Sequence, residues 1–220
     1  MANRSFSNGC FPACFKHAAI TPLLKKPTLE TSDPSSYLPI SNLDFISKIL
    51  ERFFLARFQP HIFACSNFNQ PHHSTETSLP ATQDTIYCAS DLGSLTLLVS
   101  LDFSAAFDTL INRLCTSFGI IGSVLSWLQS YLSNRTQSVR IGHHSSTPTR
   151  RTTGVPQGSI LGPLLFATHT SPIATITHFF QVCHQQYAYY TQLFIALNPS
   201  DPSSDIPVCM LYSHCFASAE

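Results

Sequence analysis

Apolar residues recur at helical spacing in two parts of the chain. From Asp44 to Phe58 they fall at intervals of three and four residues, which predicts an amphipathic helix that Pro60 stops. The same spacing predicts a second amphipathic helix over Ser123–Leu132. The residues that we expect to face inward are Phe45, Ile46, Ile49, Leu50, Phe53 and Phe54 in the first helix, and Val124, Leu125, Leu128, Tyr131 and Leu132 in the second.

Other segments carry the shorter patterns that are typical of strands. Ile20–Lys26 and Leu95–Asp102 are apolar runs too short to indicate a helix. Gln137–Ile141 alternates as a half-exposed strand does, and residues 151–153 could pair with it. Residues 27–39 are rich in Pro, Ser and Thr, which predicts a loop. The last predicted strands are Phe179–Val182 and Tyr189–Leu197, joined as a hairpin across Gln185-Gln186.

Two further predicted helices contain proline. Pro80 lies inside Thr75–Ala89 and is expected to kink that helix or delay its start. Pro163 is compatible with a helix over Ile160–Ile176 only in the first turn. Residues 1–20 show no periodic pattern. The mixture of helices and short strands indicates an α+β fold with a small antiparallel sheet packed on helices.

The overall composition excludes several kinds of protein. The 220 residues, 44% of them hydrophobic, suffice for one domain or two small ones. Twelve Lys and Arg balance twelve Asp and Glu, so no overall charge attracts nucleic acid. The eight cysteines include no CxxC pair, and a zinc site is not expected. The sequence lacks a signal-peptide pattern and a sufficiently apolar membrane span, so we expect a cytoplasmic or nuclear protein without a membrane partner.

The charges are unevenly distributed along the chain. Residues 1–70 carry a mild positive excess, whereas no Lys or Arg follows Arg151. No Asp or Glu lies between Asp108 and Asp201. The cations that could contact a phosphate backbone, or else form an ordinary solvated face, are Lys25, Lys26, Lys48, Arg52 and Arg57.

Two stretches could carry chemistry. Asp102 ends the apolar strand at 95–102, where a carboxylate at a sheet edge could hold a metal ion or a substrate, or could be a solvated residue at a turn. The glycines of Gly154–Ser159 (GVPQGS) would allow a close approach of the backbone to a ligand, and Pro156 would stiffen the turn. The same six residues could also form an ordinary Pro-Gly loop.

Seven stretches, in one order, resemble the successive conserved blocks of the reverse transcriptase of non-LTR (LINE-type) retrotransposons. The resemblance covers roughly residues 10–202. The stretches are FKHAAITPLLKKP, SYLPISNLDFISKILER, PHHSTETSL, LLVSLDFSAAFDT, LSWLQSYLSNRTQSVRIG, GVPQGSILGPLLF and YAYYTQLF.

This resemblance implies a partial right-hand polymerase made of fingers and palm. Residues 1–20 would be a divergent, irregular N-terminal segment, 21–94 the fingers and the start of the palm, and 95–200 the palm. Residues 201–220 match nothing in the family and are expected to be disordered. The last palm block and the thumb are expected to be absent.

The resemblance also assigns roles to residues. Asp102 would be the palm carboxylate that holds catalytic Mg²⁺ or Mn²⁺, and Phe107 the aromatic residue under the incoming sugar. Gln157 and Gly158 would lie near the template and the nucleotide. The implied partners are an RNA template and a DNA primer. The oligomeric state is not predicted.

The chain departs from the family at the metal-binding hairpin. Where the family has Tyr-Ala-Asp-Asp, this chain has Tyr187-Ala188-Tyr189-Tyr190, so Tyr189 and Tyr190 replace both carboxylates. Polymerases use two metal ions ~3.5–4 Å apart, and Mg²⁺ requires oxygen ligands, preferably anionic. A phenol with a pKa of about 10 is neutral near pH 7. The family also has Arg where Leu38 stands.

These departures predict a catalytically impaired remnant of an RNA-directed DNA polymerase, a nucleotidyltransferase with little or no activity. Two alternatives stay open. The chain could be a non-catalytic nucleic-acid-binding or scaffold module, or a fragment that forms no stable fold, since uncovered apolar faces favour aggregation.

Overall fold

The computed structural model describes residues 1–68, 75–101, 110–151, 154–179, 182–187 and 190–200. Contacts within the chain divide it into two compact units, each made of two segments. Unit 1 is Met1–Phe68 with Ala105–His169, and unit 2 is Asn69–Ser104 with Thr170–Glu220.

Unit 1 contains a mixed five-stranded sheet. Strand β1 (His17–Leu24) pairs antiparallel with β2 (Tyr37–Leu43) and parallel with β4 (Arg135–Ile141). Strand β4 also pairs antiparallel with the short strands β5 (His144–Ser145) and β6 (Thr149–Arg151). Residues near 151 do pair with the strand predicted at 137–141, but the pairing joins Thr149–Arg151 to Arg135–Gln137, which corrects the predicted register. Residues 152–153 lie outside the described residues, and the sheet is not purely antiparallel.

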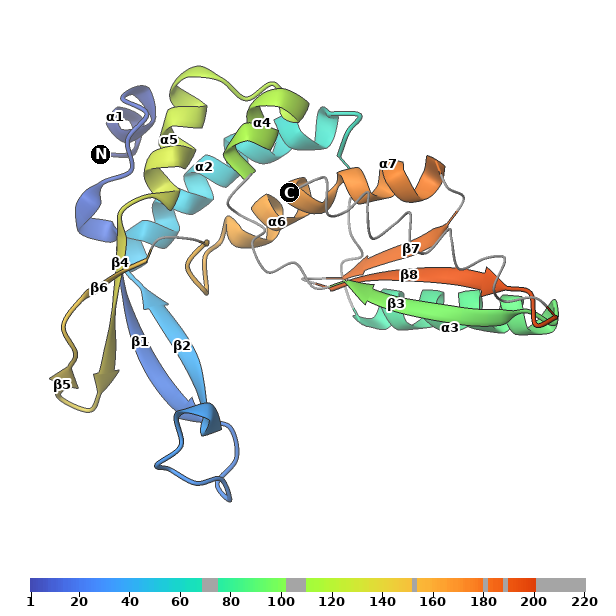
Figure 1. Ribbon diagram of the computed structural model, residues 1–220. Helices are drawn as coiled ribbons and strands as arrows, with labels where there is room; N and C mark the ends of the chain where they lie inside the picture. The colour runs from blue at the N-terminus through green and yellow to red at the C-terminus, as the bar shows by residue number, and fades with distance from the viewer. Residues whose placement is uncertain (69–74, 102–109, 152–153, 180–181, 188–189, 201–220) are drawn as a thin grey trace. The chain divides into compact units, whose positions relative to one another are not determined.

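Helices pack at one end of this sheet. Helix α1 contacts α5, and α4 also contacts α5 (Figure 1). The helices of unit 1 are α1 (Ala2–Ser7), α2 (Phe45–Ala64), α4 (Leu110–Phe118), α5 (Gly122–Leu132) and α6 (Gly162–Thr170), with short 3-10 turns η1 (Ala13–Phe15) and η2 (Pro34–Ser36).

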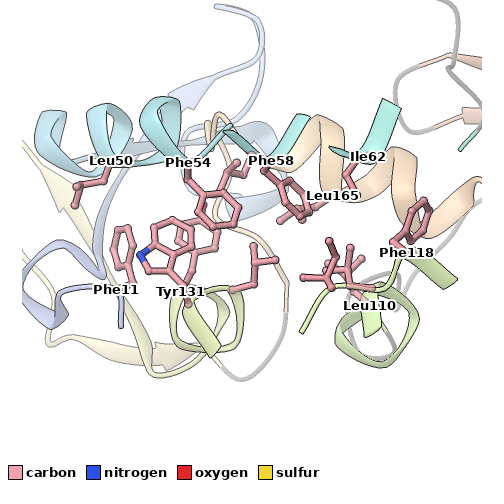
Figure 2. Packing of buried hydrophobic residues seen from close by; sticks show 14 residues of the cluster. Phe11, Leu50, Phe54, Phe58, Ile62, Leu110, Phe118, Tyr131 and Leu165 are labelled. Carbon is pink, nitrogen blue, oxygen red and sulfur yellow. The ribbon is translucent and has the colours of Figure 1, made fainter. Parts of the chain in front are cut away.

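The core of unit 1 is built around aromatic rings. Trp127 is fully buried and stacks on Phe54 with ring centroids 4.1 Å apart. Phe11 meets Trp127 and Tyr131 edge-on, at 5.4 and 5.1 Å. Figure 2 shows Phe11, Phe54 and Tyr131 gathered between the helices. The indole N–H of Trp127 donates to Ser5 Oγ at 2.9 Å, so this core also holds α1 in place.

Helix α2 buries a different face from the predicted one. Phe45, Ile46 and Phe53 are 74, 41 and 54% exposed, which corrects their assignment to the core. The buried stripe is rotated to include two polar residues, because Glu51 bonds to a turn more than a hundred residues away. The buried residues of the helix are Ser47, Leu50, Glu51, Phe54, Phe58 and Ile62.

The predicted ends of α2 also need correction. The helix starts after Asp44, whose carboxylate accepts a hydrogen bond from the Ile46 N–H at 2.7 Å. The prediction ended the helix at Pro60, but the helix continues through this residue as far as Ala64. Pro60 cannot make one of the helix's backbone hydrogen bonds, and the burial of Ile62 in the core offsets the cost of this loss.

Helix α5 matches its prediction more closely. Leu128 and Tyr131 are fully buried, as expected. Trp127, which the prediction left out, is also fully buried, and Val124 is 40% exposed instead of buried. The buried face is therefore centred one position away from the predicted one, because the large indole ring fills the space between α5 and α2.

Unit 2 contains an antiparallel three-stranded sheet in the order β3-β8-β7. The strands are β3 (Leu95–Leu101), β7 (Cys183–Tyr187) and β8 (Tyr190–Leu197). Helix α3 (Thr75–Asp91) runs along the sheet and contacts all three strands, and α7 (Pro172–Phe179) contacts β7 (Figure 1). Val182, Leu193 and Ile195 form its buried core.

Two predictions in this part of the chain are corrected. Gln185 and Gln186 lie inside β7 and are buried, instead of forming the hairpin turn. Each is bonded within unit 2: the Thr82 hydroxyl donates to the Gln185 side chain, and the Gln186 amide donates to the Thr170 carbonyl. The helix predicted over Ile160–Ile176 is divided into α6 and α7, with Pro163 in the first turn of α6 as expected.

Several elements have no counterpart in the predictions. Helix α1 and the start of β1 lie in residues 1–20, where no pattern was found, and α4 was not predicted. Strand β2 begins inside residues 27–39, which were predicted as a loop. Among the described helices, none has both the length and the apolar character needed to cross a bilayer.

Candidate functional site

The turn at Gly154–Ser159 is held by the buried carboxylate of Glu51 on α2. Its Oε2 accepts hydrogen bonds from the Ser159 hydroxyl at 2.9 Å and from the Ile160 N–H at 2.7 Å. It also accepts a longer bond, at 3.3 Å, from the Leu161 N–H. Oε1 accepts from the Ser47 hydroxyl at 3.1 Å. Four neutral donors thus surround one charged group, which fixes the turn onto α2.

Ser159 connects this turn to α6 and α5. Its Oγ accepts hydrogen bonds from the N–H groups of Leu161 and Gly162, both at 3.1 Å, and so caps the start of α6. Because Ser159 gives its own proton to Glu51, the Tyr131 hydroxyl is the donor in the 2.7 Å contact between the two hydroxyls. Burial, together with the nearby negative charge of Glu51, raises the pKa of Tyr131, which keeps the phenol neutral.

Arg135 lies beside this network and is almost completely buried. Its Nη1 donates to the Tyr131 carbonyl oxygen at 2.8 Å, and its guanidinium lies 4.8 Å from the Tyr131 ring centroid. Among the described residues, its Nε and Nη2 have no hydrogen-bond partner. Burial lowers the pKa of Arg135, the negative charge of Glu51 opposes this, and the positive charge of Arg151 adds to it.

Two glycines allow the turn to lie against the sheet. Gly154 and Gly158 have φ of +88° and +77°, in the left-handed region that favours glycine. A Cβ added to Gly158 would lie 3.4 Å from the Ser41 carbonyl oxygen of β2. A Cβ on Gly154 would lie 3.4 Å from Nη2 of Arg151. The turn therefore sits directly on β2, next to β6.

A pocket of about 390 Å³ lies where this turn meets the sheet. Gln157, which the resemblance places near the template, lines it and is exposed, as is the neighbouring Gly158. The other lining residues come from four strands of the sheet and are Ile20, Pro39, Ser41, Gln137, Arg150 and Arg151.

The cations predicted to bind nucleic acid lie elsewhere in unit 1. Lys25 and Lys26 are exposed just after β1. Lys48 and Arg52 lie one turn apart on α2, whereas Arg57 is half a turn round the helix from Lys48. The Arg57 guanidinium lies 5.3 Å from the Phe6 ring centroid.

The arginines that line the pocket beside Gln157 are instead Arg150 and Arg151. The sequence held a signal for them, namely two consecutive arginines immediately before the GVPQGS stretch. The predictions did not use it.

The positions assigned to metal binding adjoin one end of the sheet in unit 2. Leu101, the last residue of β3, pairs with Thr191, and Tyr190 at the start of β8 pairs with Tyr187. Asp102 follows Leu101 in sequence, and Tyr189 precedes Tyr190. Asp102, Phe107 and Tyr189 themselves lie outside the described residues, so their roles stay predictions.

The donors at this end of the sheet do not fit a pair of Mg²⁺ ions. The sequence has no Asp or Glu from 109 to 200, so the β7–β8 hairpin contributes no carboxylate. Within the described ranges, no three His, Cys, Asp or Glu side chains lie close enough together to hold a metal ion. Hydroxyl and amide groups such as those of Thr191 and Gln186 are neutral, whereas Mg²⁺ sites are built on carboxylates.

Comparisons with known proteins agree with the resemblance. The family described as "Reverse transcriptase (RNA-dependent DNA polymerase)" matches residues 24–194. A Drosophila melanogaster relative, "Probable RNA-directed DNA polymerase from transposon BS", is 33% identical over an alignment 185 residues long, and the match covers 74% of this chain and 19% of the relative. The "RNA-directed DNA polymerase from mobile element jockey", from the same organism, is 27% identical over an alignment 184 residues long, and the match covers 77% of this chain and 19% of the relative. This chain spans about a fifth of the length of these curated relatives.

Solved structures show a similar fold. Apo telomerase from Candida tropicalis, truncated from its C-terminal domain, matches with a TM-score of 0.53 and 11% identity, over 82% of this chain and 44% of that one. Telomerase from Candida albicans, in complex with a fragment of telomeric RNA, matches with a TM-score of 0.50 and 12% identity, over 92% of this chain and 40% of that one. This likeness confirms the predicted α+β fold of a partial right-hand polymerase. With the match to the family over most of its length, the chain belongs to the reverse transcriptase family, of the kind found in non-LTR (LINE-type) retrotransposons.

Proposed function

We propose that this chain is a reverse transcriptase domain that keeps a nucleic-acid-binding surface but has little or no polymerase activity. The observation that carries the proposal is the replacement of both hairpin carboxylates by Tyr189 and Tyr190. The pairing of Leu101 with Thr191 supports the proposal, because the end of β3 lies beside the start of β8. By the resemblance, the acids that hold the metal ions would have to meet there.

The chemistry of the donors explains the expected loss of activity. Family members use divalent metal, and Mg²⁺ or Mn²⁺ would serve here to stabilise charge on the attacking and leaving oxygens. The resemblance assigns metal binding to Asp102 and to the two hairpin positions. Because both hairpin positions carry neutral phenols, Asp102 is the one carboxylate of this set that could hold such an ion. Phe107 would still lie under a bound sugar. We therefore derive no catalytic step through a metal pair.

The turn that carries Gln157 and Gly158 supports the binding part of the proposal. Glu51, Ser159 and Tyr131 hold it rigidly against the sheet, and the glycines leave its outer side open. The partners that we propose are an RNA template and a DNA primer. We also propose that residues 21–94 contribute the fingers and the start of the palm, and that residues 95–200 contribute the palm.

Primer extension on an RNA template tests the proposal. We expect the unmodified chain to incorporate nucleotides no faster than an Asp102→Ala variant, in either Mg²⁺ or Mn²⁺. Metal ions contribute several kcal/mol to such reactions, so restoring the acids with Tyr189→Asp and Tyr190→Asp should raise incorporation by about 10²-fold or more, though not to the level of an intact polymerase.

A matched control separates this effect from general improvement of the fold. Adding Asp102→Ala to the restored variant should abolish the gain, since the new acids would lose their partner ligand. Robust synthesis by the unmodified chain that disappears in Asp102→Ala would refute the proposed inactivity.

A further inference from the structure

Two consecutive arginines of β6 face the pocket beside Gln157. Arg150 is exposed and Arg151 is half-buried, and both line the pocket together with Gln137 and Gln157. The register pairs Arg151 with the buried Arg135 of β4, and the positive charge of Arg151 acts on that of Arg135. The result is a local concentration of positive charge in a chain whose formal net charge is zero.

This positive charge is not neutralised by the protein. Within the part of the chain that the structure describes, the side chains of Arg150 and Arg151 have no hydrogen bond or ion pair to another residue. No Asp or Glu is among the residues that line the pocket. The nearest carboxylate in the network, that of Glu51, is already bonded to four neutral donors. An anion is therefore the ligand that would complete the site.

We propose that Arg150 and Arg151 bind phosphates of a single-stranded nucleic acid that passes beside Gln157. A guanidinium offers a planar fork of donors that matches phosphate oxygens. Ile20 and Pro39 provide an apolar surface next to the two arginines, suited to the sugars of the strand. This inference rests on the proposed function, because it names the contact through which that function's nucleic-acid partner is held.

A strand fits the pocket better than a nucleoside triphosphate. Triphosphates are bound in polymerases and kinases with divalent ions that bridge their phosphates and are held by carboxylates. The lining of this pocket has no carboxylate. A phosphodiester carries a single negative charge that one arginine can balance without a metal ion.

Binding of a fluorescently labelled single-stranded RNA by the full chain tests the inference. We expect the Arg150→Ala/Arg151→Ala variant to bind at least ~10-fold more weakly than the unmodified chain at physiological salt. Each phosphate contact on a single strand contributes about 0.7 to the slope of log affinity against log salt, so the slope should fall by about 1.4. The matched control, Arg4→Ala/Arg140→Ala, removes the same two guanidinium charges from exposed positions that do not line the pocket and should change both quantities much less.

Further variants and ligands keep the result unambiguous. Arg150→Lys/Arg151→Lys keeps the charge but loses the fork, so its affinity should be intermediate. Circular dichroism should give the same melting curve for all these variants, since the two arginine side chains make no hydrogen bond to other described residues and the backbone pairing of β6 is kept. If the alanine variant binds RNA as the unmodified chain does, the inference is overturned while the proposed function stands. If a labelled nucleoside triphosphate binds and RNA does not, or if the unmodified chain fails to bind RNA at low salt, both are overturned.

Discussion

Replacing Glu51 with alanine is expected to lower the free energy of unfolding by about 3–5 kcal/mol. The change removes the acceptor for the Ser159 hydroxyl and for the Ile160 and Leu161 N–H groups, all at a site closed to solvent. Each buried donor left without a partner costs about 1–3 kcal/mol, and each donor that regains a partner by local rearrangement reduces the total. The GVPQGS turn should also lose its fixed position on α2.

Chemical denaturation followed by fluorescence measures this loss. Trp127 is the single tryptophan of the chain and is fully buried, so its emission reports on unit 1 directly. The matched control is Glu30→Ala, because Glu30 is an exposed acid whose one described contact is with Ser32. Its effect should stay within about 0.5 kcal/mol. A loss below about 1 kcal/mol for Glu51→Ala would show that the carboxylate does not anchor the turn.

Replacing Trp127 with alanine should have a similar cost, about 3–5 kcal/mol. The indole stacks on Phe54 at 4.1 Å and on Tyr131 at 5.6 Å, and it bonds to Ser5 on α1. Its removal would leave a cavity between α2 and α5 and would release the hold on α1. Since the variant loses the fluorescent probe, urea unfolding should be followed by circular dichroism.

Two further variants make this test specific. Phe53→Ala, on the exposed side of α2, should cost less than about 1 kcal/mol, even though the sequence pattern assigned Phe53 to the core. Trp127→Phe should recover part of the stability, because it keeps a ring in the stack but not the hydrogen bond to Ser5. If Phe53→Ala proved as costly as Trp127→Ala, the buried face of α2 described above would be wrong.

The sequence predicts the existence of most elements but not which face of α2 is buried. Hydrophobic spacing identifies α2 and α5, and alternation identifies β4. Spacing cannot foresee that Glu51 is buried, because its bonding partners lie more than a hundred residues further along the chain. The buried face of the helix therefore includes Glu51 and Ser47, and Phe45 lies on the exposed side.

Prolines and glutamines misled the prediction of two strands. Strand β2 contains Pro39, yet it forms because β2 lies at the edge of its sheet, where a missing N–H is tolerated. Gln185 and Gln186 suggested a turn, but tertiary hydrogen bonds to Thr82 and Thr170 hold them inside β7. The partner of Gln185, Thr82, lies more than a hundred residues away in the sequence, so the sequence pattern could not reveal it.

Part of the candidate site could be predicted from the sequence, and part depends on contacts that only the fold creates. The GVPQGS motif and Gln157 could be found from sequence, since the glycines that the turn requires are part of the motif. The contribution of Arg150 and Arg151 depends on the pairing of β6 with β4, which brings them to the side of the turn. The roles of Asp102, Phe107 and Tyr189 rest on the resemblance alone and stay predictions.

Binding of Mn²⁺ to the full chain, measured by titration with electron paramagnetic resonance, tests the central claim most directly. A metal pair needs more anionic ligands than a strand end with one acid and two phenols can offer. We therefore expect no tightly bound pair of ions, and little difference between the unmodified chain and Asp102→Ala. Two tightly bound Mn²⁺ ions that are lost together in Asp102→Ala would contradict this account.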